Sequence, residues 1–249
     1  DMEAGLTEAR LLLTRLNGAG VPCATESLDP LLAPYLQDLV SWTALGARTS
    51  ESQVHRAMAS GLPMPVGIKN GTDGRVSTAI DGVETALSPQ SYVGIDQHGR
   101  VAHLSSAGNP LSHVVLRGGG SGPNFEAANV MHCESAIVAR GLEPNIVVDC
   151  SHANSGKVAK RQLDVLADVE IQISDGNQSI VGVMLESHLF EGNQTLTDDA
   201  SALRYGVSIT DACLGWEDTE RAIHGFAEGV GAALSQRQRQ GSQTQRDAA

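Results

Sequence analysis

The sequence is poor in basic residues relative to acidic ones. Its 249 residues include 17 Lys and Arg against 29 Asp and Glu, which gives a formal net charge of −12 at pH 7. An acidic surface repels the phosphates of nucleic acids and anionic membranes, so we expect neither as a partner. Local basic residues could still bind a small phosphorylated ligand.

Cysteines are few, and long apolar runs are lacking. Cys23, Cys133, Cys150 and Cys213 show no pairing pattern, which favours a reducing cytosol and therefore a cytoplasmic protein. No apolar run approaches the roughly 18 residues that a membrane-spanning helix needs, and no signal peptide is visible. The 41% of hydrophobic residues suit a globular protein with a large core.

Short apolar segments alternate with segments of helical periodicity along the chain. The predicted strands lie at residues 21–26, 43–47, 65–69 and 112–117 and at the starts of 145–155 and 180–188. The predicted helices lie at residues 6–16, 31–40, 52–60, 76–87, 125–140, 158–173 and 216–234. Two further strands, within 91–106 and joined by Gln97-His98-Gly99-Arg100, indicate an inserted β-hairpin.

This alternation requires a parallel sheet and gives six strand–helix units plus the hairpin. A closed (β/α)8 barrel needs eight strands. The pattern therefore leaves two architectures open: a doubly wound sheet, or a barrel that lacks its first two strands. We expect residues 1–235 to form this domain and the polar residues 236–249 to be a disordered tail.

Metal-binding residue types follow two of the predicted strands. Asp149 and His152 follow one, and Glu186 and His188 follow the other. Because ligands bind at the carboxyl ends of parallel strands, these residues predict one shared site. With Asp211 from a later segment, the site offers one nitrogen and two carboxylates, which suits Mn²⁺, Fe²⁺ or Zn²⁺. The alternative is that His152 is a hydrogen-bonded structural residue.

Three cations also lie at predicted strand ends: Arg48, Lys69 and Arg117. Together with backbone N–H groups of Gly118–Gly120 they could form a pocket for phosphate or carboxylate. Alternatively, each cation pairs with an acidic residue at the rim of the sheet. Glu26 could orient a water molecule, act as a base or pair with one of these cations.

Seven segments, in order, resemble those of one enzyme family. They are 46–56, 65–74, 115–119, Ser151-His-Ala-Asn-Ser155, 182–188, Glu191-Gly-Asn-Gln194 and 208–219. These segments are similar to those of the type I 3-deoxy-D-arabino-heptulosonate 7-phosphate (DAHP) synthases of the shikimate pathway. The resemblance runs from about residue 5 to 230.

The resemblance implies a metal-dependent (β/α)8 barrel enzyme, a transferase of aromatic amino acid biosynthesis. It would join phosphoenolpyruvate to erythrose 4-phosphate and release phosphate. The implied phosphoenolpyruvate-binding residues are Arg48, Lys69, Arg117, Gly46 and Ala47. Lys69 as a proton donor and Glu26 are the implied catalytic residues.

The resemblance also implies a divalent metal ion: Mn, Fe, Co or Zn. His152, Glu186 and Asp211 would be three of its four ligands, and the metal would polarise the sugar aldehyde. A homo-oligomer and an aromatic amino acid effector are further implications. The hairpin segment Asp96-Gln-His-Gly99 differs from the Lys-Trp-Gly version of some members, and the hairpin lies near the feedback site in regulated members.

Family members carry a further N-terminal segment with two strands, a cysteine ligand and a Lys-Pro-Arg-Thr loop. None of these occurs in this sequence, so we expect an incomplete barrel that lacks the N-terminal third and is inactive or nearly so by itself. Two alternatives remain: a non-catalytic barrel fragment that acts by associating with a partner chain, and another metal-dependent aldolase of the same fold.

Overall fold

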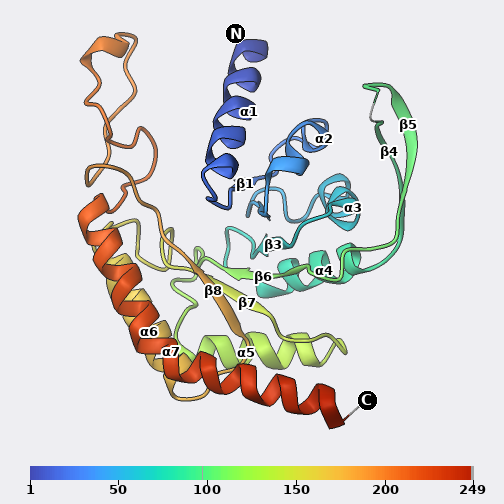
Figure 1. Ribbon diagram of the computed structural model, residues 1–249, viewed down its shortest axis with the longest axis vertical. Coiled ribbons are helices and arrows are strands. Elements are labelled where there is room, and N and C mark those ends of the chain that lie inside the picture. The colour runs from blue at the N-terminus through green and yellow to red at the C-terminus, as the bar shows by residue number, and fades with distance from the viewer. Residues whose placement is uncertain (97, 248–249) are drawn as a thin grey trace. The chain divides into compact units, whose positions relative to one another are not determined.

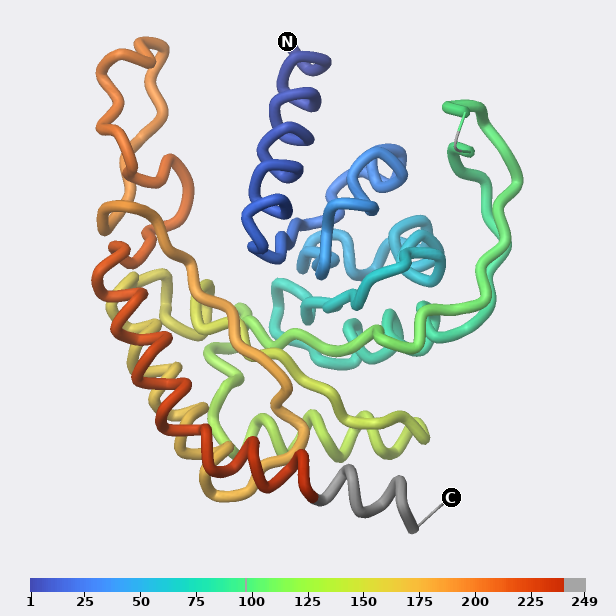
Figure 2. The backbone as a smooth tube through the Cα atoms, viewed as in Figure 1, coloured from blue at the N-terminus to red at the C-terminus, as the bar shows by residue number. Residues whose placement is uncertain are grey.

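The computed structural model describes residues 1–96 and 98–247 and divides into two compact units, Asp1–Val115 and Leu116–Ala249. Figure 1 labels the helices and strands, and Figure 2 follows the backbone from one end to the other. Each unit combines parallel strands with helices, so the chain has a mixed α/β fold, as the sequence predicts.

The first unit contains four parallel strands in the order β1-β2-β3-β6 among its described residues. The strands are β1 (Ala24–Glu26), β2 (Trp42–Leu45), β3 (Val66–Lys69) and β6 (His113–Leu116, which ends at the unit boundary). The helices are α1 (Met2–Gly18), α2 (Ala33–Leu36), the 3-10 helix η1 (Gln37–Leu39), α3 (Gln53–Gly61) and α4 (Val76–Leu87). Each strand lies within two residues of its predicted segment, apart from the late start of β1.

The core of the first unit explains why these strands read as continuous apolar runs. Every residue of β3 and β6 is buried, and Leu45, Val66 and Ile68 are essentially inaccessible to solvent. Strands of a parallel sheet are covered by helices on their faces and therefore lack a polar side. The apolar faces of α3 and α4 supply buried residues of the same unit, among them Met58 and Ile80.

The predicted hairpin is present as β4 (Gln90–Ile95) and β5 (Val101–Ser106), which pair antiparallel from Gln90↔Ser106 to Ile95↔Val101. Its turn contains Asp96, whose carboxylate accepts hydrogen bonds from the backbone N–H groups of His98 and Arg100. Gln97, part of the predicted turn, lies outside the described residues. The hairpin forms a separate two-stranded sheet within the first unit (Figure 1).

A buried histidine gives the first unit a predicted sensitivity to acid. Trp42 Nε1–H donates to His113 Nε2 at 3.0 Å, and the other ring nitrogen lies 2.9 Å from the Leu111 carbonyl. Burial lowers the pKa of His113 below its ordinary value of 6.5. Below pH 6.5 the unfolded chain therefore binds a proton that the folded chain excludes. We expect the free energy of unfolding to fall as the pH drops from 6.5 toward the folded-state pKa.

Urea unfolding at pH 7.5 and 5.5 checks this expectation, with Trp42 fluorescence as the probe in a Trp216→Phe background. His113→Gln should reduce the acid-induced loss, because the amide remains neutral. His103→Gln is the matched control, since His103 is exposed on the hairpin. An equal decrease in the free energy of unfolding between pH 7.5 and 5.5 in both variants would show that His113 is not the cause of the acid sensitivity.

The second unit contains a parallel pair of strands and three long helices among its described residues. The elements are α5 (Ala127–Val138), β7 (Ile146–Asp149), α6 (Arg161–Ser174), β8 (Ile180–Met184), the 3-10 helix η2 (Ala200–Ala202) and α7 (Trp216–Asp247). Strands β7 and β8 pair in parallel, with Asp149 opposite Met184. Helices α6 and α7 pack side by side (Figure 1).

Helix α7 is longer than the sequence pattern indicates. Its apolar stripe ends near Leu234, yet the helix continues to Asp247, whereas a disordered tail is predicted from residue 236 on. Arg237 provides one reason: its guanidinium donates to the carbonyls of Ile180 and Asn177. The assignment of 1–235 as one domain with a separate tail stays a prediction.

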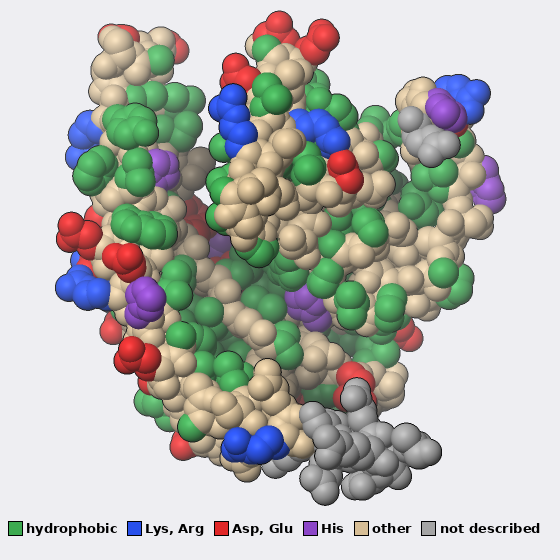
Figure 3. Space-filling view, viewed as in Figure 1, with side chains coloured by type: hydrophobic (Ala, Val, Ile, Leu, Met, Phe, Trp, Pro, Cys, Tyr) green, Lys and Arg blue, Asp and Glu red, His purple; other side chains and the backbone are tan. Residues whose placement is uncertain are grey.

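Apolar side chains remain exposed on the segment between β8 and α7. Phe190, Leu196 and Tyr205 are more than half exposed, and Figure 3 shows hydrophobic side chains gathered over this part of the surface. No helix among the described residues is both long and apolar enough to cross a bilayer.

Candidate functional site

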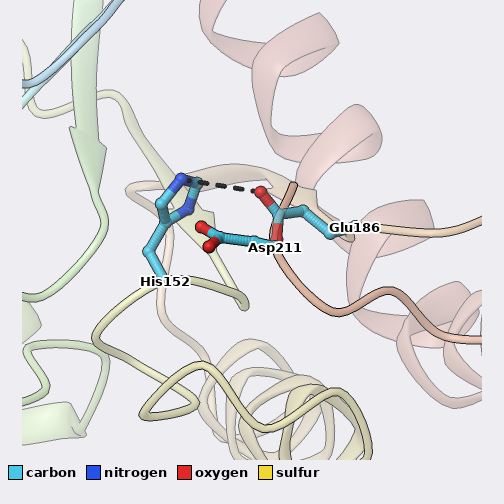
Figure 4. Close-up of side chains that lie close together, drawn as sticks. All are labelled: His152, Glu186 and Asp211. Carbon is cyan, nitrogen blue, oxygen red and sulfur yellow. Dashed lines mark ion pairs between the residues drawn. The ribbon is translucent and has the colours of Figure 1, made fainter. Parts of the chain in front are cut away.

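Three predicted metal ligands come together in the second unit. One ligand atom each from His152, Glu186 and Asp211 lies within 4.8 Å of the others. Figure 4 shows the three side chains pointing toward one another, with the imidazole and the Glu186 carboxylate joined by a dashed line. All three are partly buried. The structure thus brings these three predicted ligands together, and their binding of a metal stays a prediction.

His152 lies in a tight loop directly after β7. Its φ of 50° is in the left-handed region, which is uncommon for a residue with a side chain and is often found at functional sites. The His152 carbonyl accepts a hydrogen bond from the Lys157 N–H at 2.8 Å. His152 Nδ1 lies 2.9 Å from Asp149 Oδ2, and Nε2 lies 3.5 Å from Glu186 Oε1.

Glu186 lies two residues beyond β8 and is held by both its backbone and its side chain. The fully buried amide of Gln162, on α6, accepts from the Glu186 N–H at 2.7 Å and donates to the Glu186 carbonyl at 3.1 Å. The same carbonyl accepts from the Leu214 N–H at 2.9 Å. The Ser151 hydroxyl donates to Glu186 Oε2 at 2.5 Å. The position of this carboxylate is therefore set by three different elements.

Asp211 reaches the cluster because the segment after β8 folds back on itself. Ser187 pairs with Leu214, Gly192 with Cys213 and Asn193 with Ser208. Lys157 Nζ lies 3.2 Å from Asp211 Oδ1, in a contact that is largely exposed to solvent. Solvent screening makes such an ion pair weak, so the backbone pairs are the main determinant of where Asp211 lies.

The donor set fits a divalent transition metal. Neutral imidazole and carboxylates suit ions of the Mn²⁺ to Zn²⁺ series. A ligand histidine commonly has its second ring nitrogen directed at a carboxylate, which fixes the ring; the Asp149–His152 contact has this arrangement. His152, Glu186 and Asp211 would hold the ion, while Asp149, Ser151 and Gln162 support them.

Three residues close in sequence to this cluster have different environments: His188, Cys150 and Cys213. The exposed His188 accepts a hydrogen bond from the Leu189 N–H through Nδ1. Burial raises the pKa of the Cys150 thiol and is the main cause of the raised pKa of Cys213. Both thiols therefore stay protonated at neutral pH, as expected for small apolar residues rather than nucleophiles.

Arg117 lies immediately after β6, in the second unit, and is partly buried. Its carbonyl accepts from the Ala153 N–H at 3.2 Å, which ties the Arg117 backbone to the loop of His152. Gly118 follows with a φ of 69° and donates its N–H to Asn124 Oδ1 at 2.7 Å. A phosphate-binding role for 118–120 remains a prediction.

A buried asparagine connects these loops. The Asn154 side-chain NH₂ donates to the carbonyls of Leu116 and Asp149, at 3.2 and 2.8 Å. Its Oδ1 accepts from the Asn124 N–H at 2.8 Å. One amide thus joins the end of β6, the end of β7 and the loop after Arg117. Asn154 lies within the Ser151–Ser155 motif, but the sequence indicated no role for it.

The remaining predicted substrate residues lie in the first unit, at the carboxyl ends of β1, β2 and β3. Glu26 ends β1 and approaches Gly46 so closely that a Cβ on Gly46 would lie 1.9 Å from Glu26 Oε1. Gly46 follows β2, and the exposed Arg48 comes two residues later. Lys69 is buried at the end of β3, one residue past the Leu45↔Ile68 pair. Their common strand-end location agrees with the prediction, and their roles stay predictions.

Comparisons with known proteins identify the family. A family model described as "DAHP synthetase I family" matches residues 4–224. The chain belongs to this family. A Tyr-sensitive phospho-2-dehydro-3-deoxyheptonate aldolase from Salmonella typhimurium is 54% identical over 227 residues, which are 90% of this chain. A Phe-sensitive aldolase of the same name from Escherichia coli is 48% identical over 91% of the chain.

The chain spans 64% of the length of both aldolases. A solved structure of phospho-2-dehydro-3-deoxyheptonate aldolase from Francisella tularensis superimposes with a TM-score of 0.90 at 42% identity. The superposition covers 94% of this chain and 67% of that one. The resemblance recognised in the sequence to DAHP synthases is therefore confirmed.

Proposed function

We propose that this chain carries the metal-binding residues and part of the substrate site of a DAHP synthase. The reaction is the aldol-type condensation of phosphoenolpyruvate with D-erythrose 4-phosphate, with release of phosphate. The observation that carries the proposal is the His152, Glu186 and Asp211 cluster in a member of this family. The likeness to the Francisella structure supports a second proposal, that the strands belong to a (β/α)8 barrel with two further strands.

Each residue has a proposed role in this reaction. Arg48, Lys69 and Arg117 bind phosphoenolpyruvate as cations, and the Gly46 and Ala47 backbone lies beside it. The enol carbon attacks the aldehyde of erythrose 4-phosphate, and water then adds to the resulting cationic centre. The C–O bond to the phosphate group then breaks, which releases inorganic phosphate and leaves the ketone. Lys69 donates a proton, and Glu26 orients or deprotonates the water. A bound Mn, Fe, Co or Zn ion would supply Lewis acidity at the aldehyde.

Calorimetric titration with Mn²⁺ and with phosphoenolpyruvate tests the proposal. His152→Ala should abolish measurable Mn²⁺ binding, because it removes the single nitrogen ligand of the cluster. Arg117→Ala should weaken phosphoenolpyruvate binding by about tenfold or more, since a charge-assisted contact is lost, and should leave Mn²⁺ binding unchanged.

Arg140→Ala is the matched control, because it removes the same charge from an exposed position after α5. It should change neither affinity. Unchanged phosphoenolpyruvate affinity in Arg117→Ala would remove Arg117 from the site. A stable assembly that binds neither ligand would favour the alternative of a non-catalytic barrel fragment.

We also propose an aromatic amino acid effector, bound against the hairpin. The names of the Tyr-sensitive and Phe-sensitive relatives support this proposal. Within the first unit, a cavity of about 820 Å³ is lined by Met58, Tyr92 and Leu104, with polar groups that include Arg100 and Ser105. A cavity of mixed character suits an amino acid with an aromatic ring.

A homo-oligomer and a cytoplasmic location are the last proposals. The exposed apolar side chains between β8 and α7, with Phe190 and Tyr205 among them, support association, because contiguous exposed apolar surface marks interaction sites. All four cysteines are free thiols, and all are buried. Free thiols fit a reducing compartment.

A further inference from the structure

The two oxygens of the Glu186 carboxylate have different partners. Oε1 faces the cluster and lies 3.5 Å from His152 Nε2. Oε2 accepts the hydrogen bond from Ser151 Oγ at 2.5 Å. An O–H···O⁻ bond of this length is charge-assisted and among the stronger hydrogen bonds of proteins. One oxygen is thus directed to the ion site while the other is already engaged.

Both partners of this hydrogen bond are fixed by their backbones. The Ser151 N–H donates to Asp149 Oδ1 at 3.0 Å, and its carbonyl accepts from the Asn154 N–H at 3.1 Å. The Ser151 side chain is buried, so its hydroxyl proton has no solvent alternative. On the other side, Gln162 holds the N–H and the carbonyl of Glu186. The carboxylate therefore has little freedom to turn its second oxygen toward an ion.

The number of oxygens that a carboxylate offers influences which cation it prefers. Ca²⁺ takes six to eight oxygen ligands and commonly binds a carboxylate through both oxygens. Zn²⁺ is usually four-coordinate, so one oxygen per carboxylate is sufficient. A side chain that hydrogen-bonds to the second oxygen therefore lowers the affinity of the carboxylate for Ca²⁺ relative to Zn²⁺.

We propose that Ser151 determines metal specificity by holding Glu186 as a one-oxygen ligand. The inference rests on the proposed metal site. Ser151 does not itself contact the ion; it acts through Glu186 and is a positioning residue. A structural role alone would change stability, whereas this role changes the ratio of the affinities for two cations.

Calorimetric titration of the whole chain with Zn²⁺ and with Ca²⁺ tests the proposal. Ser151→Ala should raise the ratio of Ca²⁺ affinity to Zn²⁺ affinity by about tenfold, the lower end of the effects known for residues that support metal ligands. Ser151→Thr keeps the hydroxyl and should retain the original ratio. Ser151→Gly removes the same hydroxyl and is measured in the same way if the alanine variant does not fold.

Ser155→Ala is the matched control, because Ser155 is a second buried serine of the same loop whose hydroxyl donates to the His152 carbonyl instead. It should leave the ratio unchanged. An unchanged ratio in Ser151→Ala, or an equal change in Ser155→Ala, would overturn the inference. The proposed metal site itself would fail on a different result: the unmodified chain binds no Zn²⁺, or it binds Zn²⁺ equally well after His152→Ala.

Discussion

Gly118→Ala is expected to lower the free energy of unfolding by about 2–4 kcal/mol. The left-handed φ of 69° costs a residue with a Cβ about 1 kcal/mol. The new Cβ would also lie 2.8 Å from Ala153 Cβ and 2.9 Å from Asn154 N, and such overpacking costs about 1–3 kcal/mol. Because a backbone atom must move, the loop of His152 is displaced as well. Urea unfolding and Mn²⁺ titration measure the two effects.

Gly141→Ala separates the two contributions. Gly141 has a φ of 72°, but a Cβ there would meet nothing within 4 Å. This variant should lose only the conformational part, about 1 kcal/mol, and should keep its Mn²⁺ affinity. An equal decrease in the free energy of unfolding of the two variants would show that the contact of the new Cβ with the His152 loop costs no stability.

Asn154→Ala is expected to lower the free energy of unfolding by about 3 kcal/mol or more. Truncation leaves the carbonyls of Leu116 and Asp149 and the N–H of Asn124 without this amide. Each buried polar group that loses its partner costs about 1–3 kcal/mol. The loops that carry Arg117 and His152 lose their common support, so affinity for both ligands should fall together in the titrations described above.

Asn193→Ala provides the comparison for this variant. Asn193 also donates from its side chain to a backbone carbonyl, that of Thr210, but it is exposed. Water can replace the lost bond, so the expected cost is below about 1 kcal/mol. A small effect in Asn154→Ala, similar to that of Asn193→Ala, would contradict a central role for the buried amide.

The residues of the proposed metal site could be predicted because of where they lie along the chain. His152 and Glu186 closely follow apolar strands, and the carboxyl ends of parallel strands lie at one edge of a sheet. Asp211 was predicted on its residue type and on the family resemblance. The position of Asp211 depends on pairs between backbone segments after β8, and no periodicity in the sequence reports such pairs.

The supporting residues could not be predicted from local pattern. Gln162 lies on α6, 24 residues before Glu186, and a glutamine on a helix is usually a solvated residue. Only the packing of α6 against the end of β8 gives it two backbone partners. Ser151 and Asn154 lie within a motif that was recognised, yet the motif did not reveal which atoms they contact. The same limit applies to Trp42 and His113, which are 71 residues apart.

The hydrogen bonds of the Gln162 amide affect which sequence changes the segment after Glu186 can accept. It bonds both the N–H and the carbonyl of Glu186 from a helix, and the carbonyl accepts one further bond from the Leu214 N–H. The exposed residues that follow, such as those from 195 to 202, therefore contribute nothing to the two bonds from Gln162. That stretch can therefore accept insertions, deletions and substitutions while Glu186 keeps the support of Gln162.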